Sequence, residues 1–220
     1  MAVDPTALAK GQVVTGFAYP VVAKYSANGG VVSYSDGMDL ARGVSIKPNI
    51  EVYDEKNFYA NDVVSESAQA RFKSGTLGLT VDGLLIAAER FLMGVPSTDV
   101  ETVTVGSGQS ASSVAVTGYG ADQDIPYVGL GVVVTVQSND VEYYIGVVYT
   151  KTRFEQFAVS ATTRGEEIDW QTTDLSAKVH RDDSTKHYWQ RVTELLETKL
   201  EAYNAVRTML DMEIAAALPD

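Results

Sequence analysis

The stretch VGLGVVVTVQSNDVEYYIGVVYT, at positions 128–150, indicates the fold class most clearly. Two runs rich in valine and tyrosine, 128–137 and 141–150, are separated by the turn triplet Ser138-Asn139-Asp140. β-Branched and aromatic side chains pack well on a pleated surface, and Asn and Asp tolerate the backbone of a tight turn. The stretch therefore predicts a β-hairpin.

Further strand signals lie on both sides of this hairpin. Asn28-Gly29-Gly30 separates the runs 13–25 and 31–35, and its glycines reach positive φ at little cost, which predicts an earlier hairpin. Apolar residues alternate across 68–81, and two more strands are predicted at 154–161 and 168–179. Residues 1–180 are therefore predicted to form one mainly β domain.

Two helices are predicted. Leu84, Leu85, Ala88 and Phe91 have the spacing of a short amphipathic helix over about 82–93, which Gly94 ends. Residues 181–220 are predicted as a helical extension, with one helix from about 185 to 216 that would run ~45 Å at 1.5 Å per residue. Its apolar stripe is predicted to lie against a β surface. The stripe consists of Trp189, Val192, Leu196, Tyr203, Val206 and Leu210.

The segment from about 36 to 66 is polar and carries only weak strand signals at 44–46 and 50–53. About thirty residues of this kind are too many for a plain connection inside a compact domain. We expect a long extended loop or a protruding hairpin that contacts another molecule.

Composition excludes several function classes. With 17 basic and 29 acidic residues the formal charge is −12, so the protein should repel a phosphate backbone. The absence of cysteine excludes disulfides, Cys-ligated zinc, iron–sulfur clusters and thiol catalysis. The N-terminus has neither a basic leader nor an apolar core of a signal peptide, and no apolar run approaches the ~20 residues that span a bilayer, so no membrane partner is expected.

Candidate chemistry is sparse. His180 and His187 flank Asp182 and Asp183, which could form a metal or general-base cluster, but a polar junction entering a helix is the better interpretation. Gly106-Ser107-Gly108 lacks the Lys and the helix start of a phosphate loop. We therefore expect no enzyme, no cofactor and no metal.

Residues 91–150 contain no lysine or arginine, although they contain several acids. This pattern is explained either by chance in a β-rich segment or by a surface kept anionic as a conduit for a polyanion. The candidate anionic residues are Asp99, Glu101, Asp122, Asp124, Asp140 and Glu142.

Several segments, taken in order, resemble the major tail protein, or tail tube protein, of long-tailed (siphovirus-like) bacteriophages. None is specific alone, and their order and spacing over residues 12–192 carry the resemblance. They are Ser45-Ile46-Lys47-Pro48, Asn57-Phe58-Tyr59-Ala60-Asn61-Asp62, Leu77-Gly78-Leu79-Thr80-Val81-Asp82-Gly83-Leu84, Tyr127-Val128-Gly129-Leu130-Gly131, Tyr144, Lys151-Thr152-Arg153-Phe154, and Thr163-Arg164-Gly165-Glu166-Glu167-Ile168-Asp169-Trp170-Gln171-Thr172, with Trp189 in the terminal segment.

The resemblance implies a tail-tube-type β-sandwich or barrel with one short flanking helix, and a structural virion protein made in the bacterial cytoplasm. It implies self-assembly into hexameric rings that stack into a tube, with tape-measure, tail-terminator and distal tail proteins as partners. Genomic DNA would pass through the lumen without specific binding. The long C-terminal helix departs from the family pattern, and in such a ring we expect it on the outside, with the part beyond Tyr203 reaching a neighbouring subunit.

The resemblance also implies that the segment 36–66 reaches the next ring. The candidate inter-ring residues are Asp39, Arg42, Lys47, Tyr53, Asp54, Lys56 and Phe58. A monomeric β-sandwich binding module, such as an adhesin or a carbohydrate-binding domain, is the alternative. Tyr143, Tyr144 and Tyr149 could serve its binding face, but Tyr144 falls on the opposite side of the strand from the other two.

Overall fold

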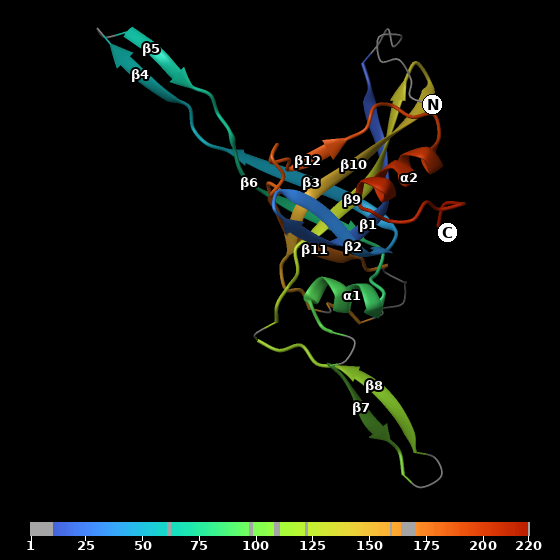
Figure 1. The fold of residues 1–220 in the computed structure, drawn as a ribbon. Helices are drawn as coiled ribbons and strands as arrows, with labels where there is room; N and C mark the ends of the chain where they lie inside the picture. Colours follow the sequence, from blue (N-terminus) through green and yellow to red (C-terminus); the bar gives the residue numbers. More distant parts are fainter. Residues whose placement is uncertain are drawn as a thin grey trace.

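A computed structural model describes residues 11–60, 63–96, 99–107, 111–121, 123–158, 160–163 and 170–219, with only the backbone for 58–60 and 63–68. Its centre is an eight-stranded antiparallel sheet with the order β2-β1-β9-β10-β11-β6-β3, and β12 pairs with β10 (Figure 1). The strands are β1 (Val13–Asn28), β2 (Val31–Asp39), β3 (Gly43–Val52), β6 (Phe72–Val81), β9 (Val128–Ser138), β10 (Val141–Phe154), β11 (Thr173–His180) and β12 (Gln190–Val192).

The long strand β10 belongs to both halves of the sheet. Its first part pairs with β9 and β12, and after a register shift between Tyr149 and Thr152 its last part pairs with β11. A bulge bends and twists a strand, so the sheet turns there and encloses one core. Buried side chains from both halves meet in that core, among them Val22, Leu130 and Leu79.

Both predicted hairpins are confirmed, because β1 pairs with β2 and β9 pairs with β10. Their signals are local: a valine-rich run on each side of a turn that suits Gly, Asn or Asp. The predicted strand 68–81 is confirmed as β6. The predicted strand 154–161 is wrong, since β10 ends at Phe154.

The short helix α1 (Ile86–Met93) covers one end of this core. Ala88 and Leu92 are buried among the strand side chains. Gly94 ends the helix in the left-handed conformation, with φ of 69°. The predicted helix at 82–93 is therefore confirmed, with a start at residue 86.

The helix α2 (Lys199–Met209) packs on the outer face of the sheet, where it forms a second cluster with Val21, Val133 and Val148. Glycines make room for it. A Cβ atom added at Gly131 would lie 2.2 Å from Val206, and one added at Gly129 would lie 2.5 Å from Leu210. The glycines therefore form a shallow channel that side chains of this helix occupy, together with the ring of Tyr34 at Gly129.

The prediction of one helix over 185–216 is wrong. Residues 190–192 form β12, and the backbone of Leu196 exchanges two hydrogen bonds with Tyr144, at 2.9 and 2.8 Å. The indole of Trp189 stacks on Phe72, with ring centres 5.4 Å apart. The free edge of β10 explains the difference, because its backbone groups need partners that only a strand supplies. The 3- and 4-residue spacing of Trp189 and Leu196 therefore did not reflect a helix.

Two further hairpins form separate two-stranded sheets that extend from the body (Figure 1). The β4–β5 arm consists of β4 (Lys56–Ala60) and β5 (Val63–Ala68), and the β7–β8 arm consists of β7 (Val100–Val105) and β8 (Ser112–Thr117). The predicted segment 36–66 is thus not one long loop, since β3 belongs to the central sheet. Its last third agrees with the protruding hairpin that its polarity predicted.

Among the described residues, no helix has the length and apolar character needed to cross a membrane.

Candidate assembly surfaces

One face of the β7–β8 arm is apolar. Cross-strand pairing places Val103 opposite Val114 and Glu101 opposite Val116, so the side chains of 103, 105, 114 and 116 share a face. These four valines, called the valine face from here on, are between 40% and 54% exposed. The other face carries Thr102, Thr104 and Ser113, together with Ala115.

The base of this arm is attached to α1. Arg90 donates a hydrogen bond from Nε to Oγ1 of Thr117, at 2.5 Å. The pKa of Tyr119 is raised to about 12 by burial and by its hydrogen bond with Glu89. Two successive residues of α1 thus hold the C-terminal side of β8. The arm projects in a defined direction although it has no sheet neighbour among the described strands.

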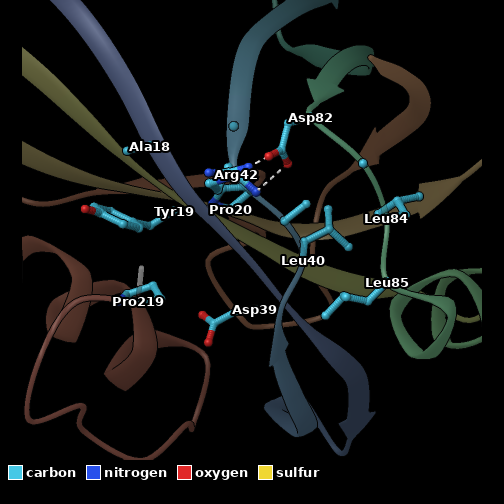
Figure 2. A pocket seen from close by; sticks show the side chains of 13 residues that line it. Ala18, Tyr19, Pro20, Asp39, Leu40, Arg42, Asp82, Leu84, Leu85 and Pro219 are labelled. Carbon is cyan, nitrogen blue, oxygen red and sulfur yellow. Dashed lines mark hydrogen bonds and ion pairs between the residues drawn. The ribbon is translucent and has the colours of Figure 1, made fainter. Parts of the chain in front are cut away.

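An apolar pocket of about 600 Å³ lies where β1, the β2–β3 connection and the β6–α1 connection meet (Figure 2). Ala18, Tyr19, Pro20, Leu40, Leu84 and Leu85 supply most of its apolar lining. Figure 2 shows Tyr19 and Pro219 on one side and the two leucines of the β6–α1 connection on the other. The apolar pocket is thus built by segments from both ends of the chain.

Polar groups surround this pocket. Arg42 donates from Nε to Asp82, at 2.5 Å, and its side chain is 81% exposed. At the opposite side Asp39 accepts a short hydrogen bond from Tyr203 and lies 3.6 Å from Arg207. The pocket therefore has an apolar floor and an ion pair on each of two rims, which favours an apolar side chain with a charged group beside it.

Tyr19 carries backbone strain at the pocket. Its φ is 52°, a value that L residues other than Asn and Asp rarely adopt. It falls in the register shift of β1 between Ala18 and Val21, and its ring lies 5.6 Å from that of Tyr203. The bulge turns Tyr19 out of the sheet and onto the helix side.

A basic cluster occupies the outer face of β10 and β11. Pairing places Lys151 opposite His180 and Arg153 opposite Lys178. The ring of Tyr127 lies against three of them, at 4.8 Å from Lys151 and 5.4 Å from Arg153, with His180 at its edge. Burial lowers the pKa of His180, and the neighbouring cations lower it further.

This basic cluster was not predicted from the sequence. Its signal is Lys151 and Arg153, and then Lys178 and His180, each pair two residues apart at or just beyond the ends of predicted strands. Part of the charge is neutralised, because Lys151 pairs with Asp183 at 2.7 Å and Lys178 lies 3.8 Å from Glu155.

The candidate anionic residues do not form one surface. Asp99, Glu101 and Asp124 lie near the base of the β7–β8 arm, before β9 begins, and Asp140 and Glu142 lie at the turn after β9 ends. β9 has 11 residues, so the two groups are separated by about 35 Å at the usual rise of a strand. Asp122 lies outside the described residues.

The candidate inter-ring residues are spread over three places. Asp39 and Arg42 border the apolar pocket, whereas Tyr53, Asp54 and Lys56 are exposed at the base of the β4–β5 arm. Lys47 lies on the open face of β3. The side chain of Phe58 lies outside the described part of the structure.

The prediction that the C-terminal apolar stripe contacts a neighbouring subunit needs correction. Tyr203, Val206 and Leu210 are at most 1% exposed, buried against the subunit's own sheet. They are not available to a neighbouring subunit. Of the rest of the stripe, Val192 is 54% exposed, while Trp189 and Leu196 pack on the body.

The two histidines have separate surroundings. The His187 ring lies 3.2 Å from the carbonyl of Asp182, and His180 packs on Tyr127. Within the described ranges, no group of three His, Asp or Glu side chains is arranged to hold a metal ion.

No known family model matches the chain, and no curated protein matches it. The geometry of these surfaces and the sequence resemblance are the features that bear on function.

Proposed function

We propose that this protein is a structural subunit that assembles with copies of itself, and that the assembly is the tube of a long-tailed phage. The observation that carries the proposal is the valine face of the β7–β8 arm. A two-stranded hairpin is only marginally stable alone, and an exposed β-branched face on a projecting arm is an interaction surface. A monomeric binding module has no need for such an arm.

The second arm supports the same proposal. β4 and β5 continue outward from β3 and β6, and Tyr53 donates a backbone hydrogen bond to Arg71 at their base, 2.8 Å long. A subunit with two arms can use one within a ring and the other between rings. The sequence resemblance adds the hexameric ring, the virion location and the tape-measure, tail-terminator and distal tail proteins as partners.

A tube that conducts DNA should not bind it. The net charge of −12 repels phosphate groups, which favours free passage. The basic cluster of β10 and β11 limits where the lumen lies, because its three cations, Lys151, Arg153 and Lys178, would slow DNA that they faced. We therefore place that cluster away from the lumen.

The experiment combines light scattering with negative-stain electron microscopy over a series of protein concentrations. Rings or tubes should appear as concentration rises. A second sample replaces residues 55–69 with the turn Asn-Gly, which keeps the pairing of Val52 with Phe72. This variant should fold with an unchanged unfolding midpoint and form rings that do not stack. A protein that stays monomeric at every concentration would refute the proposal and support a binding module.

A further inference from the structure

We propose that the valine face of one copy docks into the apolar pocket of the next copy, so that subunits join head to tail. This inference rests on the proposed function and identifies the contact that builds the ring. It follows from the shape, composition and position of the two surfaces.

Both surfaces are apolar, and the described residues of the chain leave both of them uncovered. Beside the pocket, Leu85 and Ile86 are 68% and 64% exposed, so its apolar lining continues onto the surface. The arm offers β-branched side chains from two strands in register, which give a rigid apolar ridge. A ridge and a pocket are complementary in shape, and burying both removes apolar surface from water.

An arm that occupies the pocket must come from a second copy, because the arm does not reach its own pocket. No residue of β7 or β8 lines the pocket. In Figure 1 the two strands extend from α1 away from the body, and Arg90 and Thr117 fix that direction. A patch and a pocket at different places on one molecule form a heterologous contact, which repeats until it closes into a ring or grows into a filament.

Charged residues beside the two surfaces would set the orientation of the docked arm. Glu101 shares the face of Val103 and Val105, and the guanidinium of Arg42 is exposed at the rim of the pocket. Docking the valines into the pocket brings the acidic base of the arm toward this rim. An ion pair at the edge of an interface fixes register and steers the encounter, and contributes less to affinity.

The first test changes the ridge and the pocket separately. Val103→Thr with Val114→Thr keeps the shape and the strand preference of the arm but makes the ridge polar. The matched control, Thr102→Ser with Thr104→Ser, removes methyl groups from the opposite face of the same strand. The valine variant should raise the concentration needed for assembly at least tenfold, and the control should change it less than twofold.

Two substitutions at Gly83 test the pocket as a variant and its matched control. A Cβ added there meets nothing within 4 Å. Gly83→Phe should fill the pocket and block assembly, whereas Gly83→Ala should assemble as the native protein does. Equal assembly by the two Gly83 variants would overturn the inference.

The second test uses the absence of cysteine in the native chain. Val103→Cys and Leu85→Cys are placed in two proteins of different mass, which are mixed and oxidised. A mixed disulfide should form at least five times faster than with Val31→Cys, a control position that is 70% exposed on β2.

The outcomes separate the two proposals. Rings without a faster Val103–Leu85 crosslink would overturn the docking contact and leave the tube subunit standing. A specific crosslink in short oligomers that never form rings would support the docking contact and refute the tube. Equal rates at Leu85 and Val31 without rings would overturn both.

Discussion

Substitution of Gly131 by alanine should lift α2 from the sheet. The added Cβ would lie 2.2 Å from one methyl of Val206 and about 3 Å from side-chain atoms of Leu210 and Val21, at 3.0 and 3.1 Å. Carbon atoms in contact prefer about 3.5–4.0 Å, so the Val206 methyl must move by more than about 1 Å. Val206 cannot move it by a small rotation, because a β-branched side chain in a helix has one strongly preferred rotamer. The helix itself must shift.

Overpacking of this kind costs about 1–3 kcal/mol, and the lower entropy of the unfolded chain returns about 0.4–1 kcal/mol to alanine. The two effects leave a net loss between about 0 and 2.6 kcal/mol, and the middle of that range, about 1–2 kcal/mol in the free energy of unfolding, is the expected value. In a domain of this size that lowers the melting temperature by about 2–8 °C. Gly78→Ala is the control, since its Cβ would meet only a carbonyl oxygen, at 4.0 Å, on the exposed face of β6.

A double-mutant cycle identifies the cause. Val206→Ala alone removes two buried methyl groups, worth about 1.6 kcal/mol before any cavity is counted. In the pair Gly131→Ala with Val206→Ala, the new methyl occupies the vacated space, so the combined loss should be smaller than the sum by at least about 1 kcal/mol. Urea unfolding at a concentration where light scattering shows monomers measures all four proteins. Additive losses, or a Gly131→Ala protein as stable as Gly78→Ala, would refute the idea of a glycine channel.

Two further predictions concern the C-terminus. Burial and the hydrogen bond to Asp39 raise the pKa of Tyr203 to about 12. The unfolded phenol ionises near pH 10 while the folded one keeps its proton, so the free energy of unfolding should fall between pH 10 and 12. Urea midpoints measured against pH should fall less steeply in Tyr203→Phe than in the native protein, and parallel curves would contradict this. Deletion of residues 201–220 should abolish folding rather than assembly alone, because it uncovers Val21, Val133 and Val148. Deletion of residues 216–220 should leave a cooperative unfolding transition. A folded protein without residues 201–220 would show that α2 is dispensable.

The sequence predicted the parts of the fold that local signals determine. The hairpins around Gly29-Gly30 and Asn139-Asp140 were found because a turn and its flanking strands lie within one short window. The C-terminal helix was predicted too long because a run without Gly or Pro favours a helix, whereas β12 forms only to pair with β10, about forty residues earlier. That pairing is a tertiary effect, and strand formation depends more on context than helix formation does.

The assembly surfaces were predicted in part. The protruding hairpin followed from the length and polarity of 36–66, but the valine face was overlooked, although 103, 105, 114 and 116 alternate on each side of a Ser/Gly-rich turn. The apolar pocket could not be predicted, since Tyr19, Leu40, Leu84 and Pro219 come from distant parts of the chain. The anionic candidates followed from a linear run without Lys or Arg, and the fold separates them along β9.

Net charge and the valine face act in opposite directions on assembly. Subunits with a charge of −12 repel one another, and this repulsion weakens as salt shortens the Debye length from about 30 Å at 0.01 M to about 8 Å at 0.15 M. Burial of the valine face in the apolar pocket does not weaken with salt. An interface between the basic cluster of β10 and β11 and the acids around Glu101 would weaken instead. The sign of the salt dependence therefore separates the two kinds of contact, and the docking inferred from the valine face requires assembly to increase with ionic strength.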